Sequence, residues 1–168
     1  LKEKKNLRVV KVKKSLKKIE EKSFFGGTLI QDVNSKISSL EIINGKNKLD
    51  KEKLGFFVNV LKNIKSNAIA LFDQDSLVSQ SGGQTSRVDA LQICLQKFKY
   101  RNDVFKNENL FLFSDAFFPF TDSISIIKRQ KYNIDIYAPM GSKNDLKICN
   151  YVKRHKLEFF KLSDRHFK

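Results

Sequence analysis

The sequence predicts an α/β protein in which helices cover a mixed β-sheet, a three-layer α/β/α sandwich. Two near-continuous apolar runs, NAIALFD at 67–73 and NLFLFSD at 109–115, are typical of strands buried on both faces. Amphipathic segments separate such runs, so the order from residue 50 onward is largely helix, strand, strand, helix, strand, helix, strand, helix, strand. The chain has 168 residues, of which 40% are apolar and 30% charged. This length and composition are typical of a globular protein with its own hydrophobic core.

The first third of the chain predicts three strands and a helix. RVVKVKK at 8–14 has strand propensity and is followed by a charged connector, and GGTLIQDV at 26–33 indicates a short strand. SSLEIING at 38–45 alternates and stops at Asn44-Gly45, a turn signal. The helix that follows has apolar residues at intervals of three and four, namely Leu54, Phe57, Val58, Leu61 and Ile64.

The middle of the chain predicts two buried strands around a helix. After the run at 67–73, residues 75–89 indicate a short strand, a Gly/Ser loop and the start of a helix. That helix has one apolar stripe, made of Val88, Leu91, Leu95 and Phe98. The strand at 109–115 follows, and Asp122 or Ser123 is expected to cap a helix through Ile126 and Ile127.

The last third continues the alternation of strands and helices. NIDIYAP at 133–139 alternates and ends at a proline. Ser142 with Asp145 three residues later resembles a capping box, with Leu146, Cys149 and Val152 behind it. LEFFKL at 157–162 predicts the last strand. A polar stretch, GKNKLDKE at 45–52, indicates a boundary between two parts of the chain.

Composition bounds the class of protein. The formal charge of +15 comes mostly from lysine and is densest in the first 22 residues, but no aromatic residue interleaves with that stretch as a stacking platform requires. Nucleic-acid binding is therefore the less favoured reading. No apolar run approaches the roughly 20 residues of a membrane span, and the amino end lacks the apolar core of a signal peptide, so a cytoplasmic location is expected.

The cysteines and histidines predict no catalytic or metal site. Cys94 and Cys149 lack a metal-ligand spacing and are expected to be reduced thiols of the core. His155 and His166 are expected on the surface. A zinc deaminase is excluded, because neither H-x-E nor P-C-x-x-C occurs.

Two polar loops are candidate binding segments. Asn67 precedes a buried strand and offers both a donor and an acceptor, which suits a carboxamide or the edge of a heterocycle, although a simple strand-start cap has the same signature. SGGQTSRVD at 81–89 places paired glycines before a helix. Arg87 lies in the first turn of that helix, where a cation is unfavourable unless an anion is near. This loop therefore indicates an anionic partner, unless it is merely a turn.

A third candidate is SDAFFPFTD at 114–122. Pro119 fixes one backbone dihedral and biases Phe118 toward an extended conformation, so the aromatic side chains are displayed on a rigid loop. Such a loop suits a flat ring, and Asp122 could orient a ring amine or a water. A core plug followed by a helix cap explains the same residues equally well.

In order, several segments resemble AICAR transformylase, the formyltransferase half of a bifunctional purine-biosynthesis family whose other half is IMP cyclohydrolase. The matching segments are KKNLRVVKV at 4–12, FFGGTLIQD at 24–32, KSNAIALF at 65–72, GGQTSRVDAL at 82–91, SDAFFPFTD at 114–122, the turn with Pro139, Gly141 and Ser142, and RHF at 165–167. The resemblance implies a cytidine-deaminase-like fold without zinc. It also implies that residues 1–48 end the preceding transformylase subdomain and connector, and that 49–168 form the carboxy-terminal subdomain.

The resemblance also implies an activity and its residues. The reaction is formyl transfer from 10-formyltetrahydrofolate, a cosubstrate, to the exocyclic amine of the AICAR nucleotide, with no metal. Asn67 is implied as the catalytic residue that holds the aminoimidazole carboxamide and its amine, Arg87 as a contact to the nucleotide, and Phe117 as a wall of the ring pocket. The folate pocket is expected to include Phe118, Pro119 and Asp122, and Asp122 is also expected to contact the substrate.

Several features depart from the family pattern. Ser79–Gln84 stand where the family has a glycine-richer run, Met140 replaces a glycine, and Lys168 ends the chain one position short of a terminal histidine. The family's Lys-His pair and its cyclohydrolase domain have no counterpart in the sequence, so the chain is expected to be inactive alone. A homodimer, or complementation by an amino-terminal transformylase segment, is expected. The alternatives are a basic module for nucleic acid or another polyanion, and a non-catalytic dimerisation remnant.

Overall fold

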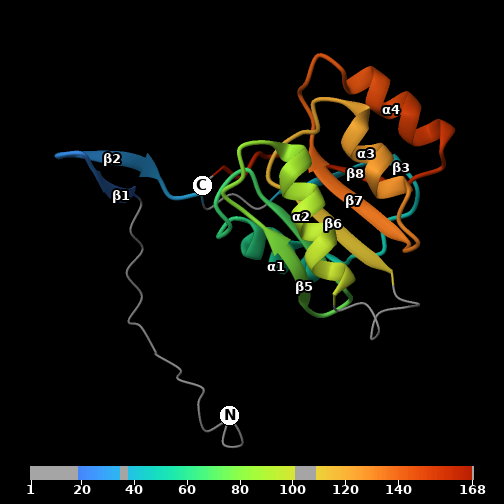
Figure 1. The fold of residues 1–168 in the computed structure, drawn as a ribbon, viewed down its shortest axis with the longest axis horizontal. Coiled ribbons are helices and arrows are strands. Elements are labelled where there is room, and N and C mark those ends of the chain that lie inside the picture. The colour runs from blue at the N-terminus through green and yellow to red at the C-terminus, as the bar shows by residue number, and fades with distance from the viewer. Residues whose placement is uncertain (1–18, 35–37, 101–108, 168) are drawn as a thin grey trace, which may run out of the picture. The chain divides into compact units, whose positions relative to one another are not determined.

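A computed structural model describes residues 19–34, 38–100 and 109–167 of the chain (Figure 1). The chain divides into two compact units, Leu1–Ser35 and Lys36–Lys168. The strand expected at 8–14 lies outside the described residues. No helix within the described residues is long and apolar enough to cross a membrane.

The described part of the first unit is a β-hairpin. Strands β1 (Ile19–Phe24) and β2 (Gly27–Asp32) pair antiparallel, with Ile19 opposite Asp32 and Phe24 opposite Gly27. The turn residues Phe25 and Gly26 both have positive φ, 40° and 79°, as a two-residue hairpin turn requires. The strand at 26–33 is thus confirmed, but the expectation of a connector ahead of it is wrong at 19–24, because pairing across this turn makes the charged segment IEEKSF a strand.

The second unit contains a mixed six-stranded sheet, as the sequence predicts. Its strands, in spatial order, are β3 (Leu40–Asn44), β8 (Phe159–Leu162), β7 (Ile134–Pro139), β6 (Leu110–Ser114), β4 (Ile69–Phe72) and β5 (Leu77–Ser81). β6, β7 and β8 run parallel, whereas β3, β4 and β5 pair antiparallel with their neighbours. Because β3 pairs with β8, the compact unit begins before residue 48, and the subdomain division between 48 and 49 stays a prediction.

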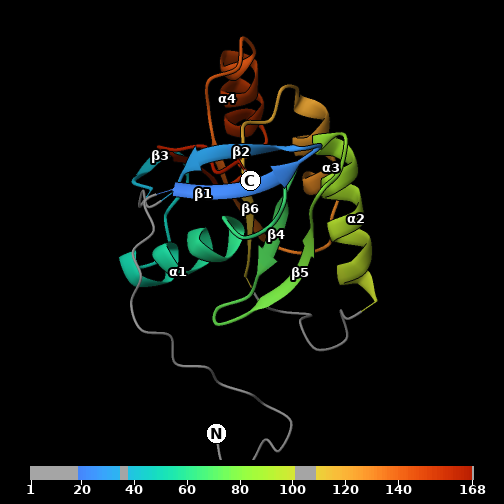
Figure 2. The ribbon, with the colours of Figure 1, turned by 90° about the vertical axis from the view of Figure 1, so that its left-hand side faces the viewer.

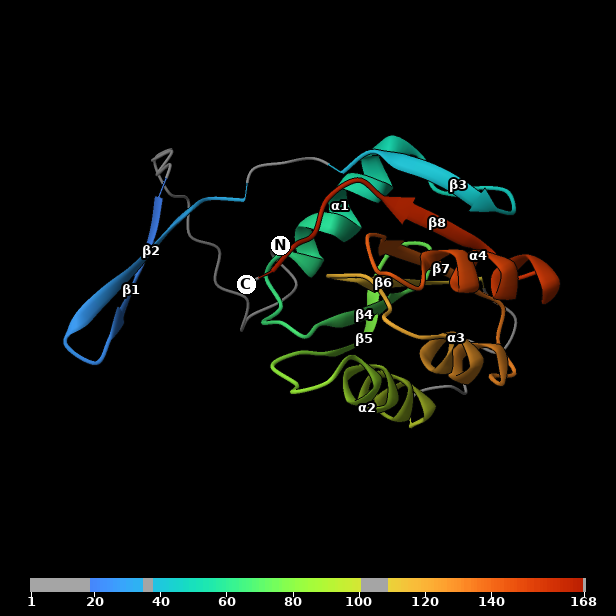
Figure 3. The same cartoon turned by 90° about the horizontal axis from the view of Figure 1, so that it is seen from above.

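Helices cover both faces of this sheet (Figures 2 and 3). They are α1 (Lys51–Leu61), α2 (Arg87–Lys99), α3 (Thr121–Lys128) and α4 (Asp145–Arg154). Seen from above, α1 lies on one side of the strands and α2 and α3 on the other (Figure 3). α3 and α4 connect successive parallel strands, β6 to β7 and β7 to β8, as crossover helices do.

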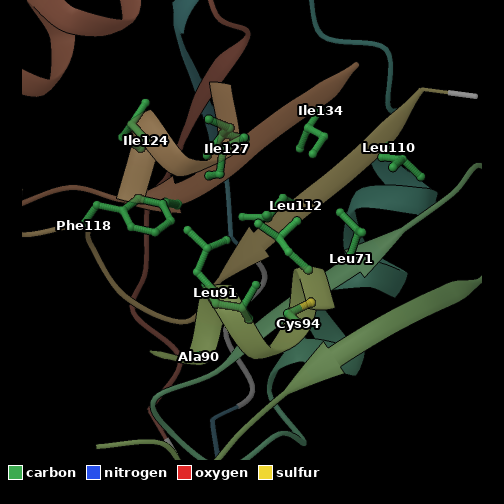
Figure 4. Packing of buried hydrophobic residues seen from close by; sticks show 14 of the residues in the cluster. Leu71, Ala90, Leu91, Cys94, Leu110, Leu112, Phe118, Ile124, Ile127 and Ile134 are labelled. Atoms are coloured by element: carbon green, nitrogen blue, oxygen red, sulfur yellow. The ribbon is translucent and has the colours of Figure 1, made fainter. Parts of the chain in front are cut away.

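The alternation of strand residues separates two cores. Along β6, Leu110 and Leu112 join the cluster beneath α2, α3 and α4, whereas Phe111 and Phe113 join the cluster beneath α1. Figure 4 shows the first cluster, with Leu112 from the sheet facing Leu91 of α2. The second is rich in aromatic rings, and the ring of Phe113 stacks on that of Tyr137 with centroids 4.5 Å apart. Each aromatic pair of this kind stabilises a fold by about 0.5–1.5 kcal/mol beyond the free energy gained by burying the surface of the two rings.

Two expected helix details are wrong. α3 begins at Thr121 with Phe120 as its N-cap, so Asp122 and Ser123 lie inside its first turn instead of capping it. On α4 the buried residues are Ile148 and Val152, while Leu146 is 79% exposed. Each residue rotates a helix by about 100°, so Leu146 lies roughly opposite Ile148 and cannot share its buried face.

Candidate functional site

The candidate segments converge at one edge of the sheet. The carboxyl ends of β6, β7 and β8 lie there because these strands are parallel, and the amino end of β4 joins them because it is antiparallel to β6. The main-chain amide of Asp115 donates to the Ala68 carbonyl at 3.3 Å, and that of His166 donates to the Asp115 carbonyl at 2.8 Å. Open α/β sheets usually bind ligands at this edge.

The glycine loop is attached to the segment that holds Asn67. The Asn67 side-chain amide donates to the Gln84 carbonyl at 2.9 Å, and the Gly83 amide donates to the Lys65 carbonyl at 2.6 Å. A Cβ at Gly82 would lie 2.4 Å from Cγ2 of Ile64 and 2.8 Å from the Lys65 carbonyl oxygen. The two segments approach so closely that no side chain fits at Gly82.

Arg87 points inward and makes several contacts. Its Nη1 forms an ion pair with Oδ1 of Asp115 and donates to Oγ of Ser114 at 3.2 Å. Its Nη2 donates to Oδ1 of Asn67 at 2.9 Å. Arg87 is 8% exposed and Asp115 is fully buried, so the ion pair lies in the protein interior.

The inward position of Arg87 answers the question raised by its place in the sequence. A cation at the amino end of α2 needs an anion nearby, and the protein itself supplies one in Asp115. The other carboxylate oxygen, Oδ2, is buried and has no hydrogen-bond partner among the described residues. A role for Arg87 in contacting a nucleotide stays a prediction.

The aromatic loop divides between surface and core. Phe117 is half-buried, and the guanidinium carbon of Arg165 lies 4.6 Å from the centroid of its ring. Phe118 is 1% exposed and packs near Ile124 and Leu91 (Figure 4). The core interpretation is thus confirmed for Phe118, whereas a role for Phe117 in binding a flat ring stays a prediction.

Two further residues of this loop, Pro119 and Asp122, are expected beside a folate. The Pro119 carbonyl accepts a hydrogen bond from the Asn144 side chain at 2.9 Å, which joins the loop to the start of α4. Asp122 is exposed in the first turn of α3, and its carboxylate accepts from the Ser123 amide at 2.7 Å. Their expected roles beside a folate stay predictions.

The turn after β7 completes this edge. The Arg165 Nη2 lies 3.5 Å from the Gly141 carbonyl oxygen. Gly141 has φ of 126°, and a Cβ there would approach the same nitrogen to 2.6 Å. Glycine at this position therefore permits both the turn and the close approach of Arg165.

The surface location expected for His166 is wrong. Its side chain is fully buried, and its Nε2 lies 2.7 Å from Oγ of Ser38. Burial, with a smaller effect of Lys62, lowers the pKa of His166 to about 4, so the imidazole is neutral at pH 7. The one sequence signal for a role of His166 other than a surface position is that it lies within the segment RHF, which resembles the family.

A cavity lies elsewhere, beside β5 and the end of α2. It has a volume of about 500 Å³ and is lined by Leu77, Val78, Ser79, Gln80, Lys97 and Tyr100. None of the predicted site residues belongs to that lining. Among the described residues, no group of three or more His, Cys, Asp or Glu side chains is placed to hold a metal ion.

The fold and this edge define a class: an α/β protein with a mixed sheet, whose candidate ligand-binding residues gather where its parallel strands end. The family described as AICARFT/IMPCHase bienzyme matches residues 1–97, more than half of the chain, and the chain belongs to this family. The matched range includes Asn67 and Arg87 and ends before the aromatic loop.

Similar curated proteins cover the whole chain. It is 36% identical over 172 residues to the bifunctional purine biosynthesis protein PurH of Persephonella marina, covering 98% of the chain and 33% of that protein. The protein of the same name from Fusobacterium nucleatum is 34% identical over 172 residues, covering 100% and 33%. The one from Clostridioides difficile is 34% identical over 175 residues, with the same coverage. The chain spans about a third of the length of these relatives.

Proposed function

We propose that this chain supplies one side of an AICAR formyltransferase site in purine biosynthesis, at the carboxyl edge of its sheet. The observation that carries the proposal is the hydrogen bond from Arg87 Nη2 to Asn67 Oδ1, which fixes the carboxamide of Asn67 at that edge. Membership of the bienzyme family supports the choice of reaction. The cytidine-deaminase-like ancestry of the fold belongs to the same proposal.

The chemistry requires an oriented amine. Oδ1 of Asn67 accepts one hydrogen bond from Arg87 and retains a lone pair, which can accept from the exocyclic amine of the AICAR nucleotide. The amine nitrogen attacks the formyl carbon of 10-formyltetrahydrofolate, a C–N bond forms, and the bond from that carbon to N10 breaks. The amine loses a proton and N10 gains one. Asn67 would orient the nucleophile and would not act as the base.

The other expected residues complete the proposed pocket. The half-buried Phe117 would flank the aminoimidazole, and Asp122 would lie beside the folate with Pro119, while the buried Phe118 would support this loop from the core. The resemblance assigns proton removal to a Lys-His pair that has no counterpart in the printed sequence. We therefore expect the 168-residue chain to bind the nucleotide without turnover, and to need a homodimer or a complementing transformylase segment for the reaction.

The test is titration calorimetry of the chain with AICAR monophosphate. Asn67→Ala should weaken binding about tenfold, because it removes the oxygen that accepts the hydrogen bond from the nucleotide amine. Asn150→Ala, at an exposed position on α4, is the matched control and should leave the dissociation constant unchanged. No binding by the wild-type chain, or equal binding by Asn67→Ala, contradicts the proposal.

A further inference from the structure

The carboxy-terminal segment is fastened to the strand that opens the second unit. The pairing of β3 with β8 continues past Leu40 and Leu162, because the Ser163 amide donates to the Ser39 carbonyl at 3.0 Å. In return, the Ser39 amide donates to Oγ of Ser163 at 2.9 Å. The chain is therefore held immediately before it reaches Arg165.

His166 fastens the same segment on the other side of Arg165. Its main-chain amide donates to the Asp115 carbonyl at the end of β6, at 2.8 Å. Nε2 of its buried ring forms a hydrogen bond with Oγ of Ser38 at 2.7 Å. Arg165 thus lies between two fixed points, while its own side chain is exposed and contacts the face of Phe117.

We propose that His166 is a positioning residue: through its hydrogen bond to Ser38 it holds the backbone that places the Arg165 guanidinium over Phe117 at the candidate site. The inference rests on the proposed function in one respect, since it takes Phe117 and Arg165 to border the nucleotide pocket. His166 itself is buried and is not proposed to touch a ligand.

The side-chain contacts of Arg165 are too weak to fix it unaided. A cation over an aromatic ring in an exposed position is a weak contact, and the distance from Arg165 to the Gly141 carbonyl is long, at 3.5 Å. Ordering a long arginine side chain also costs rotamer entropy, which these contacts do not offset. The anchored backbone on both sides is what limits the positions that the guanidinium can take.

The groups around His166 agree with a structural hydrogen bond of a neutral ring. The charge of Lys62 lowers the pKa of the imidazole, whereas the charges of Asp164 and Asp115 raise it. Desolvation is the largest influence and disfavours the charged form. A neutral imidazole has one donor and one acceptor nitrogen, so Nε2 can pair with the Ser38 hydroxyl in either direction.

The experiment follows Arg165 directly, by nitrogen-15 NMR of the arginine-labelled 168-residue chain. The Nε–H proton of Arg165 should be shifted upfield by the ring of Phe117, and Phe117→Leu assigns that shift by removing it. Ser38→Ala should reduce the shift by more than half, and Ser38→Thr, which keeps the hydroxyl, should restore it. Ser39→Ala keeps the main-chain bonds of residue 39 and should leave the shift unchanged.

A second readout separates this inference from the proposed function. Ser38→Ala should weaken AICAR monophosphate binding about fivefold, which corresponds to one hydrogen bond. A full ring-current shift in both Ser38→Ala and His166→Gln overturns the positioning role, whatever the affinity. Wild-type chain that fails to bind the nucleotide, while the shift responds to Ser38→Ala as expected, overturns the proposed function and supports the positioning role. If Ser38→Ala does not fold, His166→Gln decides by the same shift.

Discussion

Arg87 and Asp115 form an ion pair in the interior of the protein, between the first residue of α2 and the residue that follows β6. Arg87 also reaches Asn67, so one charged pair ties the glycine loop, the start of β4 and the aromatic loop together. The geometry of the candidate site therefore depends on an ion pair that is almost entirely buried.

Removal of one partner of this pair should destabilise the fold strongly. Asp115→Asn leaves the guanidinium buried without a counter-charge, which typically costs about 3–5 kcal/mol. The matched control is Asp75→Asn, because Asp75 pairs with Lys53 on the surface, where a lost pair costs about 0–1 kcal/mol. Urea unfolding of both variants measures the difference, and similar losses would contradict a structural role for the buried pair.

Two glycine substitutions should change stability in opposite directions. Gly82→Ala forces a Cβ against Ile64 and the Lys65 main chain and should cost about 1–3 kcal/mol. Gly55→Ala lies within α1 with nothing within 4 Å of the new Cβ, and should add about 0.5–1 kcal/mol by helix propensity. Thermal unfolding measures both effects. A Gly82→Ala variant with unchanged stability would contradict the close packing of the glycine loop against Ile64 and Lys65.

The stability of the protein should depend on pH through His166. Its pKa falls from 6.5 in the unfolded chain to about 4 in the fold, because burial disfavours the charged ring. The unfolded state therefore binds the proton more tightly, so stability is complete above about pH 6.5 and is lost as pH falls toward 4. The loss attributable to this residue is at most about 3 kcal/mol.

Comparison with His166→Gln isolates this effect. Asp135 has a pKa raised chiefly by burial, and it contributes with the opposite sign, since its stabilising effect is present at low pH and lost as pH rises. Both proteins contain Asp135, so it cancels in the difference between them. The urea midpoints of the wild type and of His166→Gln should approach each other as the pH falls from 7 to 4. A constant difference between the two midpoints would contradict the assignment to His166.

The two cysteines should differ in reactivity. Cys94 is fully buried, and burial raises its pKa to about 11, against smaller opposing effects of Ser79 and Lys97. Cys149 is half-buried, and its pKa is raised chiefly by burial. A disulfide reagent at pH 8 should modify Cys149 slowly in the native protein and Cys94 only after unfolding. Cys149→Ser should abolish the native reaction.

The sequence predicts the sheet better than the ends of the helices. Runs such as NLFLFSD are short and leave no polar face, which favours a strand buried on both faces of a sheet. Helix ends depend on contacts that propensity does not contain: α1 ends at Leu61, and Ile64, which was expected to belong to it, is buried beyond that end. The strand at 19–24 was missed because its pairing depends on a turn and not on apolar alternation.

The sequence predicts which segments form the candidate site, but it does not predict which of their side chains contact one another. Asn67, Arg87 and the aromatic loop do meet at one edge of the sheet. The sequence raised the need for an anion near Arg87, but it could not place Asp115 there, because 28 residues separate the two. The place of His166 in a polar tail predicts exposure, whereas the fold buries it and pairs it with Ser38, 128 residues away.

Hydrogen bonds between residues 38–39 and 163–166 bring the two described ends of the second unit together. Its first described strand and its last are neighbours, and Ser38 and His166 share a hydrogen bond. Such a unit is close to a ring in connectivity, so it should tolerate circular permutation. A short linker from Phe167 to Ser38, with new termini opened at the exposed Gln74 between β4 and β5, would keep all six strands of the sheet in place. The order in which the chain visits these elements can therefore change while the site stays assembled.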